Sequence, residues 1–363
     1  MVKTQLLVLL TAMTLLLVSC KAIITPGGGN SEGNDVAGDI ASNGITLNGT
    51  LLANTAEVYA MRNSVTVTGK TNSDNYVGVF IQGRTVTLSP FIMSKYEVTQ
   101  ELYTAVMTNQ TVSVGGQTKT LASAPFYCKA DSNDYKVLLQ GEEQKYRAAE
   151  GMTWYDAVYF CNALSEKTGL TKAYSIRVRT VNDNGNITAA TVTLVENANG
   201  YRLPTEAEWE FAARGGDPTK PDWDYTFSGA PKANGSNYSD LINTGLDAVG
   251  WYCYNTKTGT TGDELPEIGT VGYGTHQVGK KTANALGIFD MSGNVWEWCY
   301  DVSDLIATGN VTNPAGATSG SHRVCRGGSS HYYAYYCSVC YRPNRFPDGR
   351  DNDLGFRVVR SAQ

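Results

Sequence analysis

Short runs of alternating apolar and polar residues occupy the chain between residues 45 and 88. One run reads Val-Thr-Val at 65–67, and another reads Val-Gly-Val-Phe-Ile at 77–81. An alternation with a period of two places apolar side chains on one face of a strand, so these runs predict β-strands. The polar stretches at 108–150 and 217–285 have neither a helical nor a strand period. They predict an insertion and a loop-rich segment, respectively.

Three segments carry the signals of helices. The first spans residues 99–107, the second residues 154–164, and the third starts at Thr205. Thr205 and Glu208 form a capping box, in which each side chain accepts a hydrogen bond from an otherwise unpaired backbone N–H. Alternation over residues 171–199, around a central Asn-Gly dipeptide, predicts a β-hairpin. This mixture of helices, strands and irregular chain predicts an α+β domain.

The composition is typical of a globular protein rather than of a nucleic-acid binder. The 363 residues allow one large domain or two ordinary ones, and neither a tandem repeat nor a second domain is visible. The net charge of −5 argues against the basic face that nucleic-acid binding requires. The 38 glycines and 22 tyrosines favour a fold in which irregular backbone matters. We therefore expect one loop-rich domain that acts as a monomer.

Residues 1–19 are predicted to form a signal peptide. Lys3 supplies the positive start, and the apolar run over residues 6–17 is too short to span a membrane. The run ends in Leu-Leu-Val-Ser-Cys, which resembles a bacterial lipobox, so Cys20 is predicted to be acylated after cleavage before it. Several acyl chains on one residue anchor a protein firmly. The alternative is an ordinary secretory peptide with an incidental cysteine.

The segment that follows is predicted to be a tether. Residues 20–50 are rich in Gly, Asn and Ser, a composition typical of flexible linkers. The folded domain is then expected over residues 51–363. Lys21, rather than an aspartate, follows the predicted lipidation site, so nothing suggests retention at an inner membrane. We expect an exported lipoprotein at the outer membrane or cell surface.

A loop crowded with tyrosine lies between Gly-Gly-Ser at 327–329 and Leu-Gly-Phe-Arg at 354–357. Tyrosine is favoured in selected binding loops because it gives a large amphipathic contact with only two torsions to freeze. The alternative is that these are ordinary core aromatics, although their spacing suits neither a helix nor a strand. If they form a surface, replacing three of the tyrosines by alanine should leave stability nearly unchanged. The predicted ligand-binding face contains ten residues: His331, Tyr332, Tyr333, Tyr335, Tyr336, Ser338, Tyr341, Asn344, Arg345 and Phe346.

Cys337 and Cys340 form a Cys-x-x-Cys pair in the same loop. Such a pair is typical of redox-active or metal-binding sites. Neither a second pair nor a histidine at ligand spacing accompanies it, so we interpret both as buried or incidental cysteines. Export permits disulfides but does not require them.

Four motifs, in this order, resemble the formylglycine-generating-enzyme (sulfatase-modifying factor) superfamily. The resemblance runs from about residue 60 to the C-terminus. It implies an irregular α+β variant of the C-type lectin fold, with little regular secondary structure and many buried loops. The motifs are Tyr-Glu-Val-Thr at 96–99, Gly-Tyr-Arg-Leu-Pro-Thr-Glu-Ala-Glu-Trp-Glu at 200–210, Gly-Ile-Phe-Asp-Met-Ser-Gly-Asn-Val-Trp-Glu-Trp at 287–298, and the Arg-Gly-Gly-Ser and Leu-Gly-Phe-Arg pair at 326–329 and 354–357.

The third motif also carries oxygen ligands. Asp290 and Glu297 are carboxylates that flank a Gly-Asn turn, and the carbonyls of Gly293 and Val295 lie between them. Calcium takes six to eight oxygen ligands, so these four residues are a candidate structural Ca²⁺ site, an arrangement that family members resemble. The alternative is that Glu297 caps backbone amides and no metal binds.

The founding activity of the family oxidises a substrate cysteine to formylglycine with copper(I) held by two cysteines, because soft thiolates suit that ion. Alignment on residues 342–348 places the two copper positions near Ser329 and Ala334, and neither is cysteine. An ergothioneine-type iron branch would need three clustered histidines. The chain has three scattered ones, His276, His322 and His331. We therefore expect no catalytic residue, no required cofactor and no enzyme activity.

The remaining branch of the family is a binder. The chain resembles the variable proteins of diversity-generating retroelements, such as the treponeme variable lipoprotein, which display a hypervariable C-terminal surface. Randomised adenines in their Asn codons exclude Lys, Glu, Gln, Met and Trp, and none of these occurs between residues 330 and 353. The resemblance implies a variable region there, with Ala334, Cys337 and Arg342 fixed.

The expected partner is a protein or glycan on another cell, with a lipid anchor in the membrane and no nucleic acid. Two alternatives remain open: an undiversified binding or structural member of the family, and a copper-dependent oxidase of formylglycine-generating type.

Overall fold

The computed structural model describes residues 37–70, 78–129, 132, 138–231, 243–256 and 271–362. The predicted signal peptide, Cys20 and residues 20–36 of the predicted tether lie outside the described residues. Residues 36–363 group into one compact unit. Within the described ranges, no helix is both long and apolar enough to cross a membrane.

An antiparallel sheet joins both ends of the domain. Its strands follow the order β1 (Ile40–Ser42), β4 (Glu57–Met61), β7 (Phe91–Ser94) and β17 (Val359–Ser361). Strand β1 pairs with β4, so the predicted boundary at residue 51 is wrong. Ile45 is only 3% exposed, which shows that burial of apolar side chains draws this part of the predicted tether into the domain.

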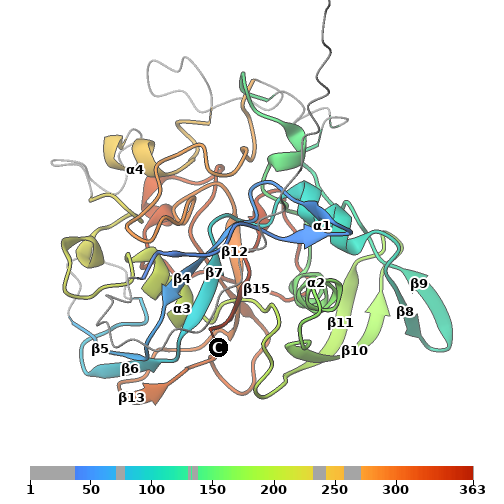
Figure 1. The fold of residues 1–363 in the computed structure, drawn as a ribbon, viewed down its shortest axis with the longest axis horizontal. Helices are drawn as coiled ribbons and strands as arrows, with labels where there is room; N and C mark the ends of the chain where they lie inside the picture. The colour runs from blue at the N-terminus through green and yellow to red at the C-terminus, as the bar shows by residue number, and fades with distance from the viewer. Residues whose placement is uncertain are drawn as a thin grey trace, which may run out of the picture. The chain divides into compact units, whose positions relative to one another are not determined.

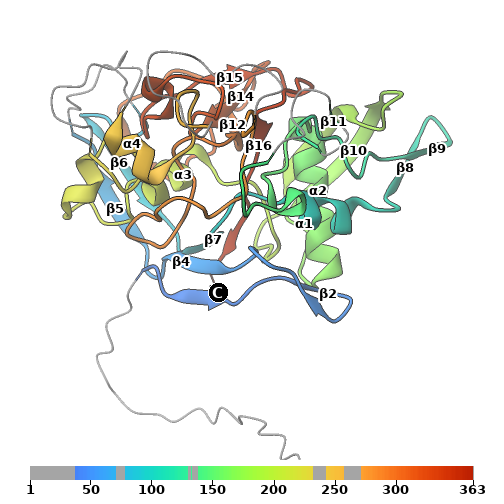
Figure 2. The same ribbon diagram turned by 90° about the horizontal axis from the view of Figure 1, so that it is seen from above.

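A second four-stranded sheet carries the C-terminal motifs. Its order is β15 (Asn344–Arg345), β14 (Arg323–Arg326), β12 (Trp296–Val302) and β16 (Leu354–Gly355). Strand β16 runs parallel to β12, and the other pairs are antiparallel. Figure 2 shows β14 and β15 on the side of the domain opposite to β2 and β4.

Smaller sheets complete the strand content. A three-stranded sheet has the order β13 (Gly309–Thr312), β6 (Arg84–Leu88), β5 (Val65–Thr68). Within the predicted strand at 77–81, Ile81 forms only an isolated bridge with Lys70, so that strand prediction is wrong. The remaining pairs are β2 (Thr46–Leu47) with β3 (Thr50–Leu51), β8 (Thr111–Val114) with β9 (Gln117–Thr120), and β10 (Tyr174–Val181) with β11 (Ile187–Leu194).

The three predicted helices are confirmed as α1 (Gln100–Met107), α2 (Trp154–Lys167) and α3 (Glu206–Ala213), and the hairpin predicted at 171–199 is β10–β11 (Figure 1). Both hydrogen bonds of the capping box predicted at α3 are present. The segments expected to lack regular structure contain short elements whose signals are weak. These are the β8–β9 hairpin, helix α4 (Thr244–Val249), and the 3₁₀ turns η1 (Gln144–Tyr146) and η2 (Pro221–Asp224).

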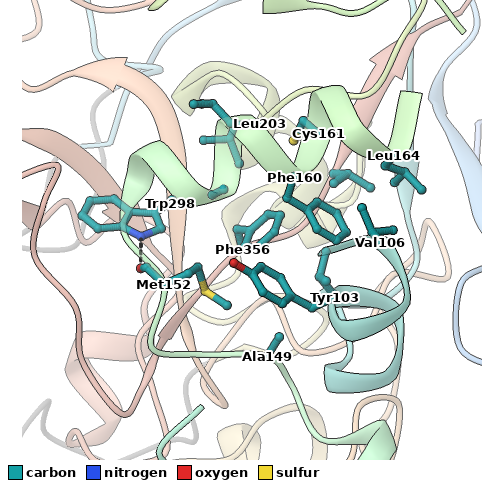
Figure 3. Close-up of a cluster of buried hydrophobic side chains, with 14 of the residues drawn as sticks. Tyr103, Val106, Ala149, Met152, Phe160, Cys161, Leu164, Leu203, Trp298 and Phe356 are labelled. Atoms are coloured by element: carbon teal, nitrogen blue, oxygen red, sulfur yellow. Dashed lines mark hydrogen bonds between the residues drawn. The ribbon is translucent and has the colours of Figure 1, made fainter. Parts of the chain in front are cut away.

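Aromatic rings fill the core between α1, α2 and the C-terminal chain. Tyr103 stacks on Phe160 at 5.3 Å between ring centroids, and Phe160 meets Phe356 edge to face at 5.1 Å (Figure 3). Trp298 is fully buried and donates a hydrogen bond from its indole Nε1 to the carbonyl of Met152. The core therefore fixes the first half of β12, where Trp296 contacts Tyr332 of the tyrosine-rich loop.

Candidate binding surface of the C-terminal loop

Two glycines turn the chain sharply at the end of β14. Gly327 and Gly328 have φ angles of 99° and 79°, a region that L side chains rarely adopt. A Cβ at Gly328 would also lie 2.5 Å from the Sγ of Cys337. The Gly-Gly-Ser motif is therefore required for the loop to fold back over its own 3₁₀ turn, η3 (Ala334–Cys337).

Hydrogen bonds then fix the first residues after the turn. The Ser329 hydroxyl donates to a carboxylate oxygen of Asp353 at 2.5 Å, and the same hydroxyl accepts the N–H of His331 at 3.2 Å. The backbone N–H of Ser330 donates to the carbonyl of Asn294 at 2.9 Å. Ser329 and Asp353 are both buried, so these contacts belong to the scaffold.

Two arginines fix the other end of the loop. The buried Arg326 guanidinium donates to the carbonyls of Val339 and Tyr341, both at 2.8 Å. Arg342 binds the carboxylate of Glu206 with two hydrogen bonds of 2.6 and 2.7 Å. These bonds connect the end of the loop to the start of α3.

The structure divides the ten predicted binding residues by exposure. Phe346 is 57% exposed, Tyr333 is 40% exposed and Asn344 is also exposed. Ser338 is fully buried and its hydroxyl accepts the N–H of Cys340, so its prediction as a surface residue is wrong and its contacts are internal to the loop. The others are half-buried: His331, Tyr332, Tyr335, Tyr336, Tyr341 and Arg345.

Four of the half-buried tyrosines pack into one cluster above β12. Tyr336 lies 5.1 Å from Tyr332, 3.7 Å from Tyr335 and 5.0 Å from Tyr341, measured between ring centroids. The indole of Trp296 supports the cluster, with its centroid 5.4 Å from the ring of Tyr332. These tyrosines are therefore partly core residues and partly surface residues, because each ring is packed on one side and accessible on the other.

The polar residues of this surface have different charges. Burial, the largest cause, lowers the pKa of His331 to about 4, so its imidazole is neutral at pH 7. The Arg345 guanidinium donates to the hydroxyl of Tyr332 at 3.3 Å and supplies a positive charge. The surface thus presents aromatic rings, neutral polar groups and one cation.

Alanine substitutions should separate the packed rings from the exposed ones. We expect Tyr332→Ala combined with Tyr336→Ala to lower the unfolding free energy by several kcal/mol, because both rings pack against the core. Phe346→Ala should change it by less than about 0.5 kcal/mol, since that ring is mostly exposed. Urea denaturation of both variants measures the difference. Equal effects would contradict this division of the surface.

Two aromatic neighbours of this surface come from the segment predicted to be loop-rich. Tyr254 stacks on Tyr333 at 5.8 Å, and Tyr273 meets His331 edge to face at 5.2 Å. They lie about 60 to 80 residues before the loop in the sequence, and no local pattern indicates that they pack there. Trp296 belongs to one of the family motifs, but the motif gave no sign that this indole supports the tyrosine cluster.

The two copper positions hold residues that do not ligate copper. Ser329 is bound to Asp353, and Ala334 is buried at the start of η3. Burial raises the pKa of Cys337, and the Sγ of Cys340 accepts a hydrogen bond from Arg214 at 2.8 Å. Both are buried, as the sequence analysis predicted. Over the described ranges, no three His, Cys, Asp or Glu side chains are grouped so as to hold a metal ion.

One of the candidate calcium ligands, Glu297, is bound to an arginine. Both carboxylate oxygens of Glu297 accept hydrogen bonds of 2.7 Å from Arg357, and one of them also accepts the indole N–H of Trp209 at 2.8 Å. Asp290 accepts the N–H of Gly279 at 2.7 Å. A guanidinium on both oxygens of Glu297 does not fit a calcium cage, so the structure does not support this site and calcium binding stays an untested prediction.

The backbone of the same motif serves the scaffold. The N–H of Gly293 donates to the carbonyl of Gly327 at 2.7 Å, and the N–H of Val295 donates to the carboxylate of Glu97 at 3.1 Å. Gly293 therefore connects this motif directly to the turn that starts the tyrosine-rich loop.

The fold and these motifs define a class of protein. Residues 52–362 match the family model described as "Sulfatase-modifying factor enzyme 1-like domain", and the chain belongs to this family. Its fold is the irregular, loop-rich α+β C-type lectin-fold variant that the motifs implied. The resemblance to the formylglycine-generating-enzyme superfamily is therefore confirmed.

The relatives and solved structures that the chain resembles include a protein named a chaperone, an enzyme and a variable protein. "Chaperone protein LppX" of Paenibacillus barcinonensis is 35% identical over 300 residues, which are 80% of this chain and 86% of that protein. The formylglycine-generating enzyme of Streptomyces coelicolor is 34% identical over 171 residues, and the matched region spans about half of that enzyme (48%). Among solved structures, Treponema denticola variable protein 1 matches with a TM-score of 0.62 and 30% identity, covering 86% of this chain and 98% of that one.

Proposed function

We propose that this protein is a surface-displayed lipoprotein that binds varied ligands through residues 331–346 and catalyses no reaction. The observation that carries the proposal is the separation of backbone from side chains in the loop. Arg326 and Ser329 hold the main chain, whereas Tyr333, Asn344 and Phe346 expose their side chains to solvent. Such a loop tolerates changes at its exposed positions without loss of the fold.

The placement of the surface in the domain suits display. In Figure 2 strand β14, which leads into the loop, and strand β15, which is part of it, lie opposite β2 and β4. The chain enters the described domain just before β1, which pairs with β4. A lipid anchor at Cys20 would hold the domain at the outer membrane or cell surface. The similarity to the Treponema denticola variable protein supports this arrangement.

The composition of the loop supports diversification. Residues 330–353 contain none of the five types that adenine randomisation of Asn codons excludes. The genomic neighbourhood tests this part of the proposal. We expect a reverse transcriptase gene beside a near-copy of the segment that encodes residues 327–357, with differences at adenines. If a complete genome contains neither, the diversification proposal fails.

The partner that suits this surface is a protein or glycan on another cell. Rigid aromatic rings with neutral polar neighbours give large contacts at low entropic cost, as in other selected binding loops.

The test is binding of the protein to a glycan array and to intact bacterial cells. A matched variant carries Tyr333→Ala and Phe346→Ala, which should remove binding, and a control carries Arg179→Ala on β10. Equal binding by the two variants would place the binding face elsewhere.

We also expect no formylglycine-forming activity. Ser329 and Ala334 lack the thiolates that copper(I) prefers, and Cys337 is buried. Incubation with copper(I), oxygen and a cysteine-containing peptide should leave the mass of the peptide unchanged. Formation of formylglycine that is lost in a Cys337→Ser variant would reverse this conclusion and favour an oxidase.

A second candidate function is that of an undiversified family member that binds unfolded proteins. The 35% identity to the relative named a chaperone, over 80% of this chain, favours it. In that case the protein should suppress aggregation of heat-unfolded citrate synthase at equimolar ratio, and substitutions at Tyr333 and Phe346 should not alter binding of cells or glycans.

A further inference from the structure

A cavity of about 390 Å³ lies between β6, β13 and the end of β12. Five charged residues line it: Arg84, Arg342, Glu206, Asp301 and Asp304. Apolar side chains line it as well, with Val79, Val311 and Ile306 among them. Its volume lies within the range of small-molecule sites. None of the ten residues of the predicted binding face lines it, so it is a separate site.

The guanidinium of Arg84 is the unusual group in this cavity. Arg84 is only 7% exposed, and its side chain makes one hydrogen bond in the described structure, a long one of 3.3 Å to the carbonyl of Val79. Its Nε has no hydrogen-bond partner, and no carboxylate of the described residues lies within 4.0 Å of its nitrogens. Burial, the largest cause, lowers the pKa of Arg84, although nearby carboxylates, among them Glu206 and Asp301, act to raise it. A buried cation without a directly bound counter-ion is costly, because it has lost part of its water.

Other arginines of the same region show the usual arrangement. Arg342 holds Glu206 with two short hydrogen bonds, and Arg326 holds Glu210. The charge of Glu206 is therefore already balanced, although this carboxylate lines the cavity. Arg84 is left as the positive group that no described carboxylate pairs with.

The two other carboxyl groups that line the cavity, Asp301 and Asp304, form no ion pair with Arg84 within the described ranges. Asp301 accepts the N–H of Glu206 at 2.8 Å, at the start of α3. Burial, and then the nearby charge of Glu206, raise its pKa well above the ordinary value for an aspartate. Because its pKa is raised, Asp301 opposes an incoming anion less than an ordinary aspartate does.

We propose that this cavity binds a small monocarboxylate with a short apolar chain, whose carboxylate pairs with Arg84. The carboxylate supplies the counter-charge that the protein lacks, in the two-pronged geometry that guanidinium groups favour. Val79, Val311 and Ile306 accommodate the apolar chain. A dianion such as phosphate is disfavoured, because Glu206 lies in the same cavity and only one cation is unbalanced.

Calorimetric titration of the full chain with sodium hexanoate tests the proposal. We expect saturable binding of hexanoate in the millimolar range or tighter, and binding of hexan-1-ol at least about tenfold weaker, because the alcohol has the chain without the charge. Arg84→Met should weaken hexanoate binding by about tenfold or more. The control Arg179→Met changes an arginine on β10 and should leave binding unchanged. Inorganic phosphate should bind less well than hexanoate.

Folding is checked separately. Arg84→Met removes an unpaired buried charge, so it should not lower the thermal midpoint. A second variant, Ala307→Trp, places a large side chain at the exposed rim of the cavity and should also weaken hexanoate binding. Equal affinity for hexanoate and hexanol, or unchanged hexanoate binding in a folded Arg84→Met variant, would overturn the proposal. None of these outcomes depends on the tyrosine-rich loop.

Discussion

Replacement of Arg357 by methionine should destabilise the domain by about 3–5 kcal/mol. Arg357 and Glu297 are both fully buried and share two hydrogen bonds of 2.7 Å. Glu97 and Asp290 also interact with this guanidinium, which is the cation of the group. Its removal leaves carboxylates in the interior without a counter-charge, and burial already raises the pKa of Asp290 to about 6 and that of Glu97 well above its ordinary value.

Urea denaturation monitored by tryptophan fluorescence measures this effect. The double variant Glu297→Met with Arg357→Met removes both charges and should recover part of the lost stability. Arg179→Met, on the surface of β10, should change stability by less than about 0.5 kcal/mol. A loss of less than about 1 kcal/mol in the single variant would show that the pair is not the structural centre of the motif.

Asparagine at position 353 should flatten the dependence of stability on pH. Burial raises the pKa of Asp353 to about 7, from an ordinary value of 3.8, so the folded state favours the protonated acid. The contribution of this group is therefore fully present below about pH 4 and is lost as the pH rises through about 7. The total is on the order of 4 kcal/mol at most.

The measurement is the free energy of unfolding of both proteins at several pH values between 5 and 8.5. The wild-type chain should lose stability relative to Asp353→Asn across this range. The amide keeps an acceptor for the Ser329 hydroxyl, so the variant should fold. Burial lowers the pKa of His331 to about 4, so the folded state favours its neutral form and stability falls as the pH drops from about 6.5 toward 4. Both proteins carry His331, so this contribution cancels in the difference between them. Parallel curves for the two proteins would mean that Asp353 is ionised in the folded state.

Local signals predicted the helices and the long hairpin correctly. Thr205 and Glu208 mark the start of α3, and the Asn-Gly dipeptide marks the turn between β10 and β11. The false strand at 77–81 has a different cause. The buried carboxylate of Glu210 accepts the N–H of Val79 at 2.7 Å, so the apolar residues there surround a long-range contact rather than follow a sheet.

The sequence indicated where the candidate site lies along the chain, but not which of its residues are buried. Residue types favoured in binding loops indicated residues 331–346, where three of the ten predicted residues are exposed and six are half-buried. Exposure along an irregular loop follows no period, so nothing in the sequence distinguished the buried Ser338 from the exposed Tyr333. The contact of Tyr332 with Trp296 and that of Tyr333 with Tyr254 depend on how distant segments pack.

The arginine clamp on the loop has a consequence for engineering. Arg326 binds the carbonyls of residues 339 and 341, and every amino acid has a carbonyl in its backbone. These hydrogen bonds therefore do not depend on which side chains residues 339 and 341 carry. Foreign segments of equal length, placed between the clamp and the double-glycine turn, would meet the same two attachment points. The domain is thus a natural starting scaffold for synthetic binder libraries in which the exposed positions are randomised and Arg326 is kept.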